Sequence, residues 1–300
     1  MTIEQVEDAP LRRTPKRGFA MGHKAIPLPA KILPAQHLFG ANRIRLAQSA
    51  DLRGYVDVIR NQNQTEKCVG MSLARIIHVQ AQVQKFGAPN PHATPYPSEM
   101  GIYDLAREEE STGDLLDQGS SPGMAIQALT EDIGVPLERD WPADDSKIND
   151  PLPVDVLARA LAVKVTNAFA ISTSGQQLSD DCAQALINNH AISMAISVGD
   201  SYENCSGETP VVAIPANGKV YGGHDITLVG FRIVNSRRQF LNAGSWGVDW
   251  GFGGYAWLDE SVIVATGQFG SSDFIVTQVV PDFSLSAAHR ALLNPPAQES

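Results

Sequence analysis

The chain has 300 residues, of which 43% are hydrophobic and 19% are charged, and it carries a formal net charge of −10. A chain of this size can bury one large core or two lobes that share a cleft. It contains no apolar run of the roughly 18 residues that span a membrane, so we expect no transmembrane segment. The acidic balance argues against nonspecific nucleic-acid binding, because phosphate contacts need a basic surface.

The three cysteines are Cys68, Cys182 and Cys205. An odd number without a zinc-ligand spacing predicts neither a disulfide scaffold nor a metal site, and we expect no cofactor. Residues 1–8 lack both the basic start and the apolar segment of a secretory signal. These features favour synthesis in a reducing, intracellular compartment.

Residues 1–50 form a basic N-terminal extension. They contain eight Lys or Arg against three acidic residues, a net charge of +5, which leaves −15 for the rest of the chain. Prolines at Pro27, Pro29 and Pro34 favour an extended course over a helix. We expect this arm either to lie across the cleft of its own acidic body as an inhibitory segment or to dock on a partner protein. The plainer interpretation is a flexible tail.

A mainly helical lobe is predicted for residues 51–163. Apolar residues recur with a helical period from Leu73 to Val83, so a long helix begins near Cys68. We expect a proline-rich loop at residues 89–97 and two further helices, which are predicted at residues 98–110 and 123–133.

A sheet lobe is predicted for residues 164–281, where the pattern changes to alternating or continuous apolar runs. One helix is expected at residues 180–189, and residues 282–300 are left as a C-terminal tail. Strands are expected at residues 191–198, 225–234, 239–242, 255–258 and 274–280.

Three residues that are distant in sequence carry the chemistry of a thiol nucleophile: Gln62, Cys68 and His224. Cys68 lies in or next to the first turn of its helix, where unpaired N–H groups and the positive dipole end favour a thiolate. An imidazolium at His224 would lower the pKa of the thiol further. The amide of Gln62 can donate to the oxyanion that forms when the thiolate attacks a carbonyl.

The order of these motifs resembles the papain-like cysteine peptidases (C1-type), specifically their bacterial branch, over roughly residues 50–280. The resemblance therefore extends over a whole domain. The motifs that carry it are, in chain order, residues 58–62, Cys68, Gly134-Val135-Pro136, Trp141-Pro142, Gly222-Gly223-His224, Ser245-Trp246-Gly247 and Gly253-Gly254-Tyr255.

The resemblance implies an α+β, two-lobed fold in which a helical lobe with the cysteine faces an antiparallel sheet or barrel lobe with the histidine. It implies Cys68 as nucleophile, His224 as general base and acid, and Gln62 as oxyanion donor. Trp246 would cover the histidine side, and Gly223 would form part of the substrate-binding wall. The implied activity is endopeptidase-like hydrolysis of a peptide or protein.

The chain departs from the family pattern next to the histidine. Gly244 stands directly before Ser-Trp-Gly, where the family usually has the asparagine that orients the histidine. Asn242 lies two residues earlier, and in a regular strand its side chain points to the same face, so it is a candidate substitute. Lys67, directly before the nucleophile, could favour the thiolate electrostatically.

Each of these residues also has a plainer interpretation. A cysteine at an apolar helix start is often a small buried side chain, His224 alone fits a core histidine, and Trp246 fits the core equally. Gly244 supports a second function class, a catalytically weak or inactive binding or structural module in a larger assembly such as a virus particle. A third hypothesis applies the same thiol chemistry to acyl transfer or to a non-protein amide.

Overall fold

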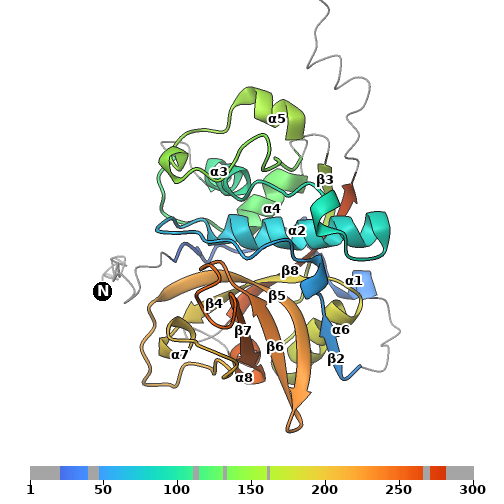
Figure 1. The fold of residues 1–300 in the computed structure, drawn as a ribbon, viewed down its shortest axis with the longest axis vertical. Coiled ribbons are helices and arrows are strands. Elements are labelled where there is room, and N and C mark those ends of the chain that lie inside the picture. Colours follow the sequence, from blue (N-terminus) through green and yellow to red (C-terminus); the bar gives the residue numbers. More distant parts are fainter. Residues whose placement is uncertain are drawn as a thin grey trace, which may run out of the picture.

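The computed structural model describes residues 21–39, 47–110, 115–130, 134–160, 163–265 and 271–281. It consists of two halves that meet along one long helix (Figure 1). The helical half contains α2 (Cys68–Phe86), α3 (Glu99–Glu110), α4 (Pro122–Thr130) and α5 (Val154–Ala160). The mixed helix-and-sheet architecture confirms the expected α+β class.

The other half is built on one mixed sheet, mostly antiparallel, with the strand order β1-β3-β8-β4-β5-β6-β7 and with β2 paired to β5. Its strands are β1 (Leu33–Pro34), β2 (Ser49–Asp51), β3 (Val163–Ala170), β4 (Ile192–Val198), β5 (Gly222–Val234), β6 (Arg237–Ala243), β7 (Tyr255–Asp259) and β8 (Ser271–Pro281). The remaining helices are α1 (Gln36–Phe39), α6 (Gly175–Ile187), α7 (Asp200–Glu203) and α8 (Glu260–Val264).

Helix α2 belongs to the helical half and packs against the sheet half. Residues 68–82 are all buried, as expected for a helix that is covered on every side. The helix ends at Gly87, whose φ of +64° and N–H bond of 2.9 Å to the Val83 carbonyl form a left-handed C-cap. Near its start, the Ser72 hydroxyl donates to the Ile226 carbonyl of β5 at 2.7 Å, which holds the first turns of α2 against that strand.

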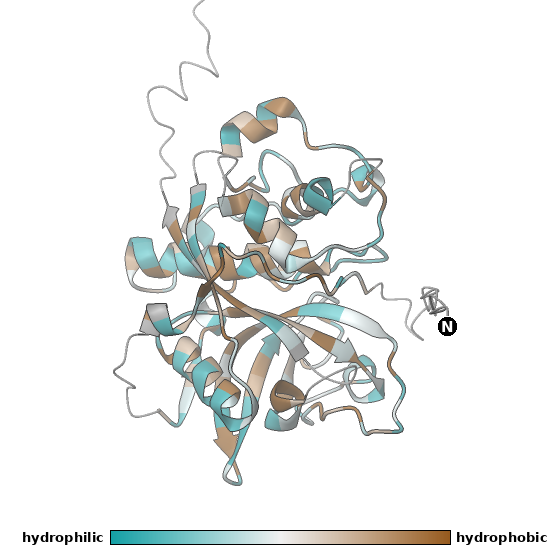
Figure 2. Cartoon of the chain, turned by 180° about the vertical axis from the view of Figure 1, so that it is seen from behind, coloured by the Kyte–Doolittle hydropathy of each residue, from teal (hydrophilic) through white to brown (hydrophobic). Residues whose placement is uncertain are grey.

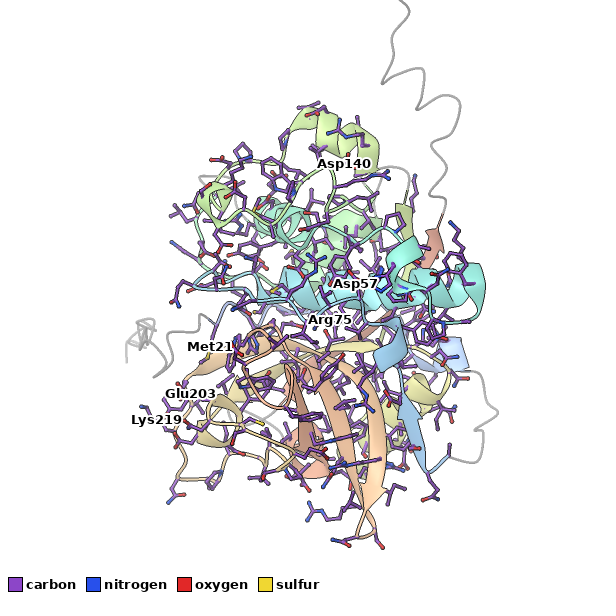
Figure 3. The ribbon with its side chains drawn as sticks, viewed as in Figure 1. Met21, Asp57, Arg75, Asp140, Glu203 and Lys219 are labelled. Carbon is purple, nitrogen blue, oxygen red and sulfur yellow. The ribbon has the colours of Figure 1, made fainter. Side chains whose placement is uncertain are left out.

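A buried arginine also joins α2 to the sheet half. The Arg75 guanidinium donates to the Ala243 carbonyl at 2.6 Å and to the Gly244 carbonyl at 3.0 Å. Figure 3 shows Arg75 at the boundary between the halves. The charged donor satisfies the carbonyls of the last residue of β6 and of the residue after it, where the ladder to β5 stops. The position of the loop after β6 is therefore fixed from the helical half.

The apolar core is continuous across both halves. Figure 2 shows apolar segments along the central strands and along the helices that face them. The largest buried apolar side chains come from both parts of the chain: Trp250, Tyr103, Tyr202, Phe231, Phe240, Leu52, Met71, Leu73, Ile76 and Ile77. Within the described residues, no helix is long and apolar enough to cross a membrane.

The predicted elements are confirmed with changes at their ends. The helix expected at residues 180–189 begins five residues earlier, at Gly175. Strand β3 was not expected, and neither were the two short strands that the N-terminal extension adds to the sheet. Such short pairings depend on a neighbouring edge and not on local alternation. The basic residues before position 21 and the tail at residues 282–300 lie outside the described residues.

Candidate active site

Cys68 is the first residue of α2 and its side chain is fully buried. Backbone groups of Asp225, Gly22 and Val69 hydrogen-bond its sulfur. Because Asp225 directly follows His224 on β5, the thiol lies beside the strand that carries the histidine. The structure thus brings together two residues that are 156 positions apart in the sequence.

Burial shifts the pKa values of the thiol and of the imidazole in the direction that favours their neutral forms. Burial raises the pKa of Cys68 to about 12, and the charge of Asp225 adds to this effect. Burial also lowers the pKa of His224 to about 3, and the charge of His23 lowers it further. Both shifts disfavour the thiolate–imidazolium pair, because burial penalises the charged form of each group.

Gln62 reaches the site through a short antiparallel contact between two loops. Its backbone N–H donates to the Ser245 carbonyl at 2.8 Å, and the Gly247 N–H donates to the Arg60 carbonyl at 3.1 Å. Its side-chain Nε2 donates to the Thr65 carbonyl at 2.9 Å, while its Oε1 accepts from the Ser245 hydroxyl at 2.7 Å. The side-chain amide is therefore held in one orientation.

His224 has one hydrogen-bond partner among the described residues. Its Nε2 lies 3.3 Å from the Ser245 hydroxyl, and its Nδ1 has no partner. The Trp246 ring lies against the imidazole, with the centroids 4.9 Å apart and the planes at 31°. Tyr202 approaches the same imidazole edge-on at 5.9 Å. Trp246 thus lies against the imidazole, and Ser245 lies between Gln62 and His224.

Asn242 bonds to Tyr202 and not to His224. Its Nδ2 donates to the Tyr202 hydroxyl at 3.1 Å, because strand β6 places Asn242 opposite Leu228, four residues along β5 from the histidine. At Gly244, an added Cβ would lie 2.8 Å from the Trp250 ring and 2.9 Å from the Gly254 carbonyl oxygen. The asparagine of the family pattern has no room at this position while Trp250 stays in place.

Other sequence candidates near the site have structural partners. Lys67 is buried, and its Nζ lies 2.6 Å from Asp145, so its charge is neutralised by a carboxylate. His78 is buried, with Nε2 3.1 Å from the Thr94 carbonyl. Cys182 and Cys205 are buried and form no disulfide within the described residues. None of these four residues is among the groups that hydrogen-bond Cys68 or His224 in the described chain.

Residues 21–24, here called the cleft segment, lie between the two halves. The Ser120 N–H donates to the Gly22 carbonyl at 2.7 Å, and the Lys24 N–H donates to the Ser120 carbonyl at 2.9 Å. On the other wall, the His23 N–H donates to the Gly223 carbonyl at 3.3 Å. Figure 3 shows Met21, at the start of this segment, on the boundary between the halves.

The fit of the cleft segment is tight at Gly22. An added Cβ would lie 1.9 Å from the Glu66 carbonyl oxygen, so only glycine fits without movement. On the opposite side, a Cβ on Gly119 would lie 2.1 Å from the Gly22 carbonyl oxygen. The segment therefore fills the space between the nucleophile loop and the Ser120 loop.

Sequence reasoning missed four residues of this site: Ser245, His23, Asp225 and Asp273. Ser245 belongs to the Ser-Trp-Gly motif. Because Gly244 stands in place of the usual asparagine, the sequence already offered the Ser245 hydroxyl as a candidate partner for His224. His23, Asp225 and Asp273 carried no local signal, because they meet only in the folded chain. Among the described residues, no group of three or more His, Cys, Asp or Glu side chains is arranged to hold a metal ion.

Comparisons with known proteins agree with this geometry. The model of the papain family cysteine proteases matches residues 46–271. Xylellain, a cysteine protease from Xylella fastidiosa, superposes with a TM-score of 0.69 at 22% identity, covering 90% of this chain and 99% of that one. No curated protein sequence matches the chain.

Two further solved structures share the fold. Digestive procathepsin L2 from the larval midgut of Tenebrio molitor gives a TM-score of 0.68 at 18% identity, covering 89% of this chain and 81% of that one. The bromelain protease from Ananas comosus, in complex with the E64 inhibitor, gives a TM-score of 0.57 at 17% identity, covering 78% of this chain and 99% of that one. The helical half and the sheet half are thus arranged as in these proteases.

Proposed function

Because the chain belongs to the papain family of cysteine proteases, we propose that it cleaves peptide bonds of a protein substrate with Cys68 as nucleophile and His224 as base and acid. The observation that carries the proposal is the joint position of three groups. Cys68 begins α2 beside the strand of His224, and the Gln62 amide is held next to the histidine through Ser245.

The hydrogen bonds around Ser245 set the tautomer of His224. The Ser245 hydroxyl donates its proton to Gln62 Oε1 at 2.7 Å, so its oxygen accepts from the Nε2–H of His224. Nδ1 is then the basic nitrogen, and it has no other partner in the described chain. In the proposed reaction Nδ1 takes the thiol proton of Cys68.

The remaining steps use the same groups. The Cys68 sulfur attacks the peptide carbonyl carbon, and the resulting oxyanion accepts hydrogen bonds from the Gln62 side chain and from the backbone N–H of Cys68. Nδ1 returns its proton to the leaving amine as the C–N bond breaks. Water, deprotonated by His224, then attacks the thioester and restores the thiol.

Ser245 acts as the positioning residue for His224 in this proposal. Its hydroxyl occupies the Nε2 side of the imidazole, which the asparagine orients in the family pattern. Since Gly244 cannot carry a side chain beside Trp250, the hydroxyl is the group that remains to hold the ring. A neutral hydrogen bond of this kind contributes about 1 kcal/mol, so the role supports catalysis without being indispensable.

The cleft segment keeps the enzyme latent in this proposal. It occupies the backbone groups of Ser120 and Gly223 that would bind an extended substrate, and it buries the thiol. It also brings the charge of His23 close to His224, which lowers the pKa of that histidine and disfavours the thiolate–imidazolium pair. Release of the segment restores water and the reactive pair.

The test is labelling by a peptide-like, thiol-directed electrophile across pH. We expect the full chain to label slowly and Gly22→Ala, which displaces the cleft segment, to label quickly near neutral pH. Labelling should vanish in Gly22→Ala/Cys68→Ala and drop sharply in Gly22→Ala/His224→Ala. Cys182 and Cys205, both buried, provide the internal reference.

The same experiment separates the competing function. Gly244 is the feature that favours a catalytically weak or inactive binding module. If Cys68 in the folded Gly22→Ala variant labels no faster than Cys182 or Cys205, the peptidase proposal is wrong and the module remains. If labelling is fast but only non-peptide amides are cut, the thiol chemistry stands with a different substrate class.

A further inference from the structure

A buried basic side chain of the cleft segment lies between two carboxylates beside the catalytic residues. The Nδ1 of His23 is 3.4 Å from Asp225, and its Nε2 is 3.3 Å from Asp273. The His23 side chain is 6% exposed, Asp225 is fully buried and Asp273 is 14% exposed. We call the space between Asp225 and Asp273 the acidic pocket.

The inner carboxylate of the pocket is held rigidly. The Ser193 hydroxyl donates to Asp225 Oδ1 at 2.7 Å, and the Ser72 hydroxyl of α2 lies 2.8 Å from that of Ser193. The other oxygen, Oδ2, accepts no directed hydrogen bond and faces the imidazole of His23. A buried carboxylate in this state needs a cation, because an uncompensated buried charge is strongly unfavourable.

The outer carboxylate is turned toward the cleft by a backbone irregularity. The pairing of β4 with β8 shifts by one residue between Ser193 and Ala195, which marks a bulge in β8. Asp273 lies in this bulge with a φ of +53°. Bulges re-aim side chains that would otherwise follow the alternation of the strand. Here the result is a second carboxylate directed at the same cation.

The two carboxylates favour the protonated form of His23. Burial alone lowers its pKa, but the carboxylates of Asp225 and Asp273, 3.4 Å and 3.3 Å from the two ring nitrogens, outweigh this effect and raise the pKa to about 9. Its backbone N–H binds the Gly223 carbonyl, and its two neighbours bind both backbone groups of Ser120. The preceding residue, Gly22, hydrogen-bonds the sulfur of Cys68. His23, which occupies the pocket, therefore directly follows the residue that contacts the Cys68 sulfur.

We propose that the acidic pocket formed by Asp225 and Asp273 selects a basic side chain of the substrate next to the cleaved bond, and that His23 occupies it as an internal substitute. The proposal rests on the proposed peptidase function. An extended substrate that uses the Ser120 and Gly223 backbone groups places one side chain where His23 now lies. An arginine or lysine there neutralises Asp225, whereas an apolar side chain leaves that charge buried without a partner.

The first experiment measures substrate preference in the Gly22→Ala background. Fluorogenic peptide amides carry Arg, Leu or Glu at each of the three residues before the cleaved bond. We expect one position at which Arg exceeds Leu in kcat/KM by about tenfold or more, as hydrogen bonds to charged groups predict, with Glu the poorest. Asp273→Asn should reduce this Arg-to-Leu ratio about tenfold.

A second pocket variant and a control variant complete this test. Asp225→Asn should reduce the ratio as well, and it is interpreted only where its thermal unfolding matches the parent, because Ser193 is bonded to the same carboxylate. Asp155→Asn is the charge-matched control, since Asp155 is 66% exposed and pairs with Arg159 on α5. It should leave the ratio unchanged. An unchanged ratio in folded, active Asp273→Asn and Asp225→Asn variants contradicts the proposal.

A binding measurement decides the case in which no substrate is cut. The Gly22→Ala/Cys68→Ala variant is titrated with the Arg and Leu peptides by calorimetry, with and without Asp273→Asn. Tighter binding of the Arg peptide that is lost in Asp273→Asn supports the acidic pocket even if the peptidase proposal fails. Equal binding of the two peptides overturns the acidic pocket while fast labelling of Cys68 would leave the peptidase proposal intact.

Discussion

The wall of the cleft that carries Cys68 is one continuous helix, whereas the wall that carries His224 is assembled from separate segments. On the first wall, the nucleophile, Ser72 and Arg75 all belong to α2. On the second, His224 is surrounded by Ser245 and Trp246 after β6 and by Tyr202 of α7. A single helix tolerates little variation in the direction of its first side chain. On a wall built from separate segments, a different segment can supply the residue that contacts the histidine.

This difference explains where the chain departs from the family pattern. The cysteine wall has Cys68, the proposed nucleophile, at the start of a long buried helix. The histidine wall has Gly244 where the family pattern predicts an asparagine, and Trp250 fills the space beside it. Ser245, already bonded to Gln62, provides the contact to His224 instead. The predictions below test how far the two walls depend on each other, beginning with the largest expected effect.

Arg75→Met should break the connection between the two walls. The variant leaves the Ala243 and Gly244 carbonyls without their buried donor. We expect the free energy of unfolding to fall by about 3 kcal/mol, the upper end of the range for hydrogen bonds to a charged group. Denaturant unfolding checks this value. Arg139→Met is the matched control, because Arg139 is 58% exposed and should change stability by less than about 0.5 kcal/mol.

Gly22→Ala should separate the cleft segment from both walls. Its Cβ would overlap the Glu66 carbonyl oxygen, and overpacking of this kind costs about 1–3 kcal/mol. Labelling of Cys68 should therefore accelerate by about tenfold or more near pH 7. Ala25→Ser, an exposed position next to the segment, should have no effect. Unchanged labelling in Gly22→Ala would show that the segment does not limit access to the thiol.

Ser245→Ala tests the contact that Ser245 makes with His224 on the histidine wall. In the Gly22→Ala background we expect kcat to fall about tenfold with KM little changed, as the loss of one hydrogen bond predicts. The alkaline limb of the pH–rate profile should move to lower pH, because the imidazolium loses the acceptor of its Nε2–H. Ser245→Thr keeps the hydroxyl and should restore most of the rate. A purely structural role would lower stability without moving this limb.

The smallest effect is the pH dependence of the cleft segment. The pKa of His23 is raised to about 9 from 6.5, so its contribution to docking is complete below pH 6.5 and is lost as the pH rises through about 9. The groups that face His23 are Asp225, Asp273 and His224.

The measured quantity is the labelling rate of Gly22→Ala divided by that of the full chain. This ratio should fall roughly sevenfold between pH 7 and pH 8. His23→Gln should remove the pH dependence of the ratio, whereas His92→Gln, on an exposed His–Asp pair, should preserve it. A ratio that rises with pH would contradict a protonated His23 in the pocket.

The sequence by itself predicted the α+β class, the helix that begins near Cys68 and most strands of the sheet half. These features depend on the spacing of apolar residues along short stretches, which is a local property. The motif order also predicted site roles for Gln62, Cys68, His224 and Trp246. In the structure Ser245 links Gln62 to His224, Trp246 lies against His224, and Cys68 lies beside the strand that carries His224. The helix dipole at Cys68 was likewise readable from the sequence.

Only the tertiary structure decided the state of the site. The partner of Asn242 followed from its register on β6, and the partner of His224 followed from a loop contact with residues 60–62. The pKa shifts of Cys68 and His224 result from burial in the folded chain, to which Gly22 and His23 of the cleft segment add a hydrogen bond and a charge. The acidic pocket needs three distant segments and a bulge. Desolvation and charge pairing depend on what surrounds a group in space, and no local pattern encodes that.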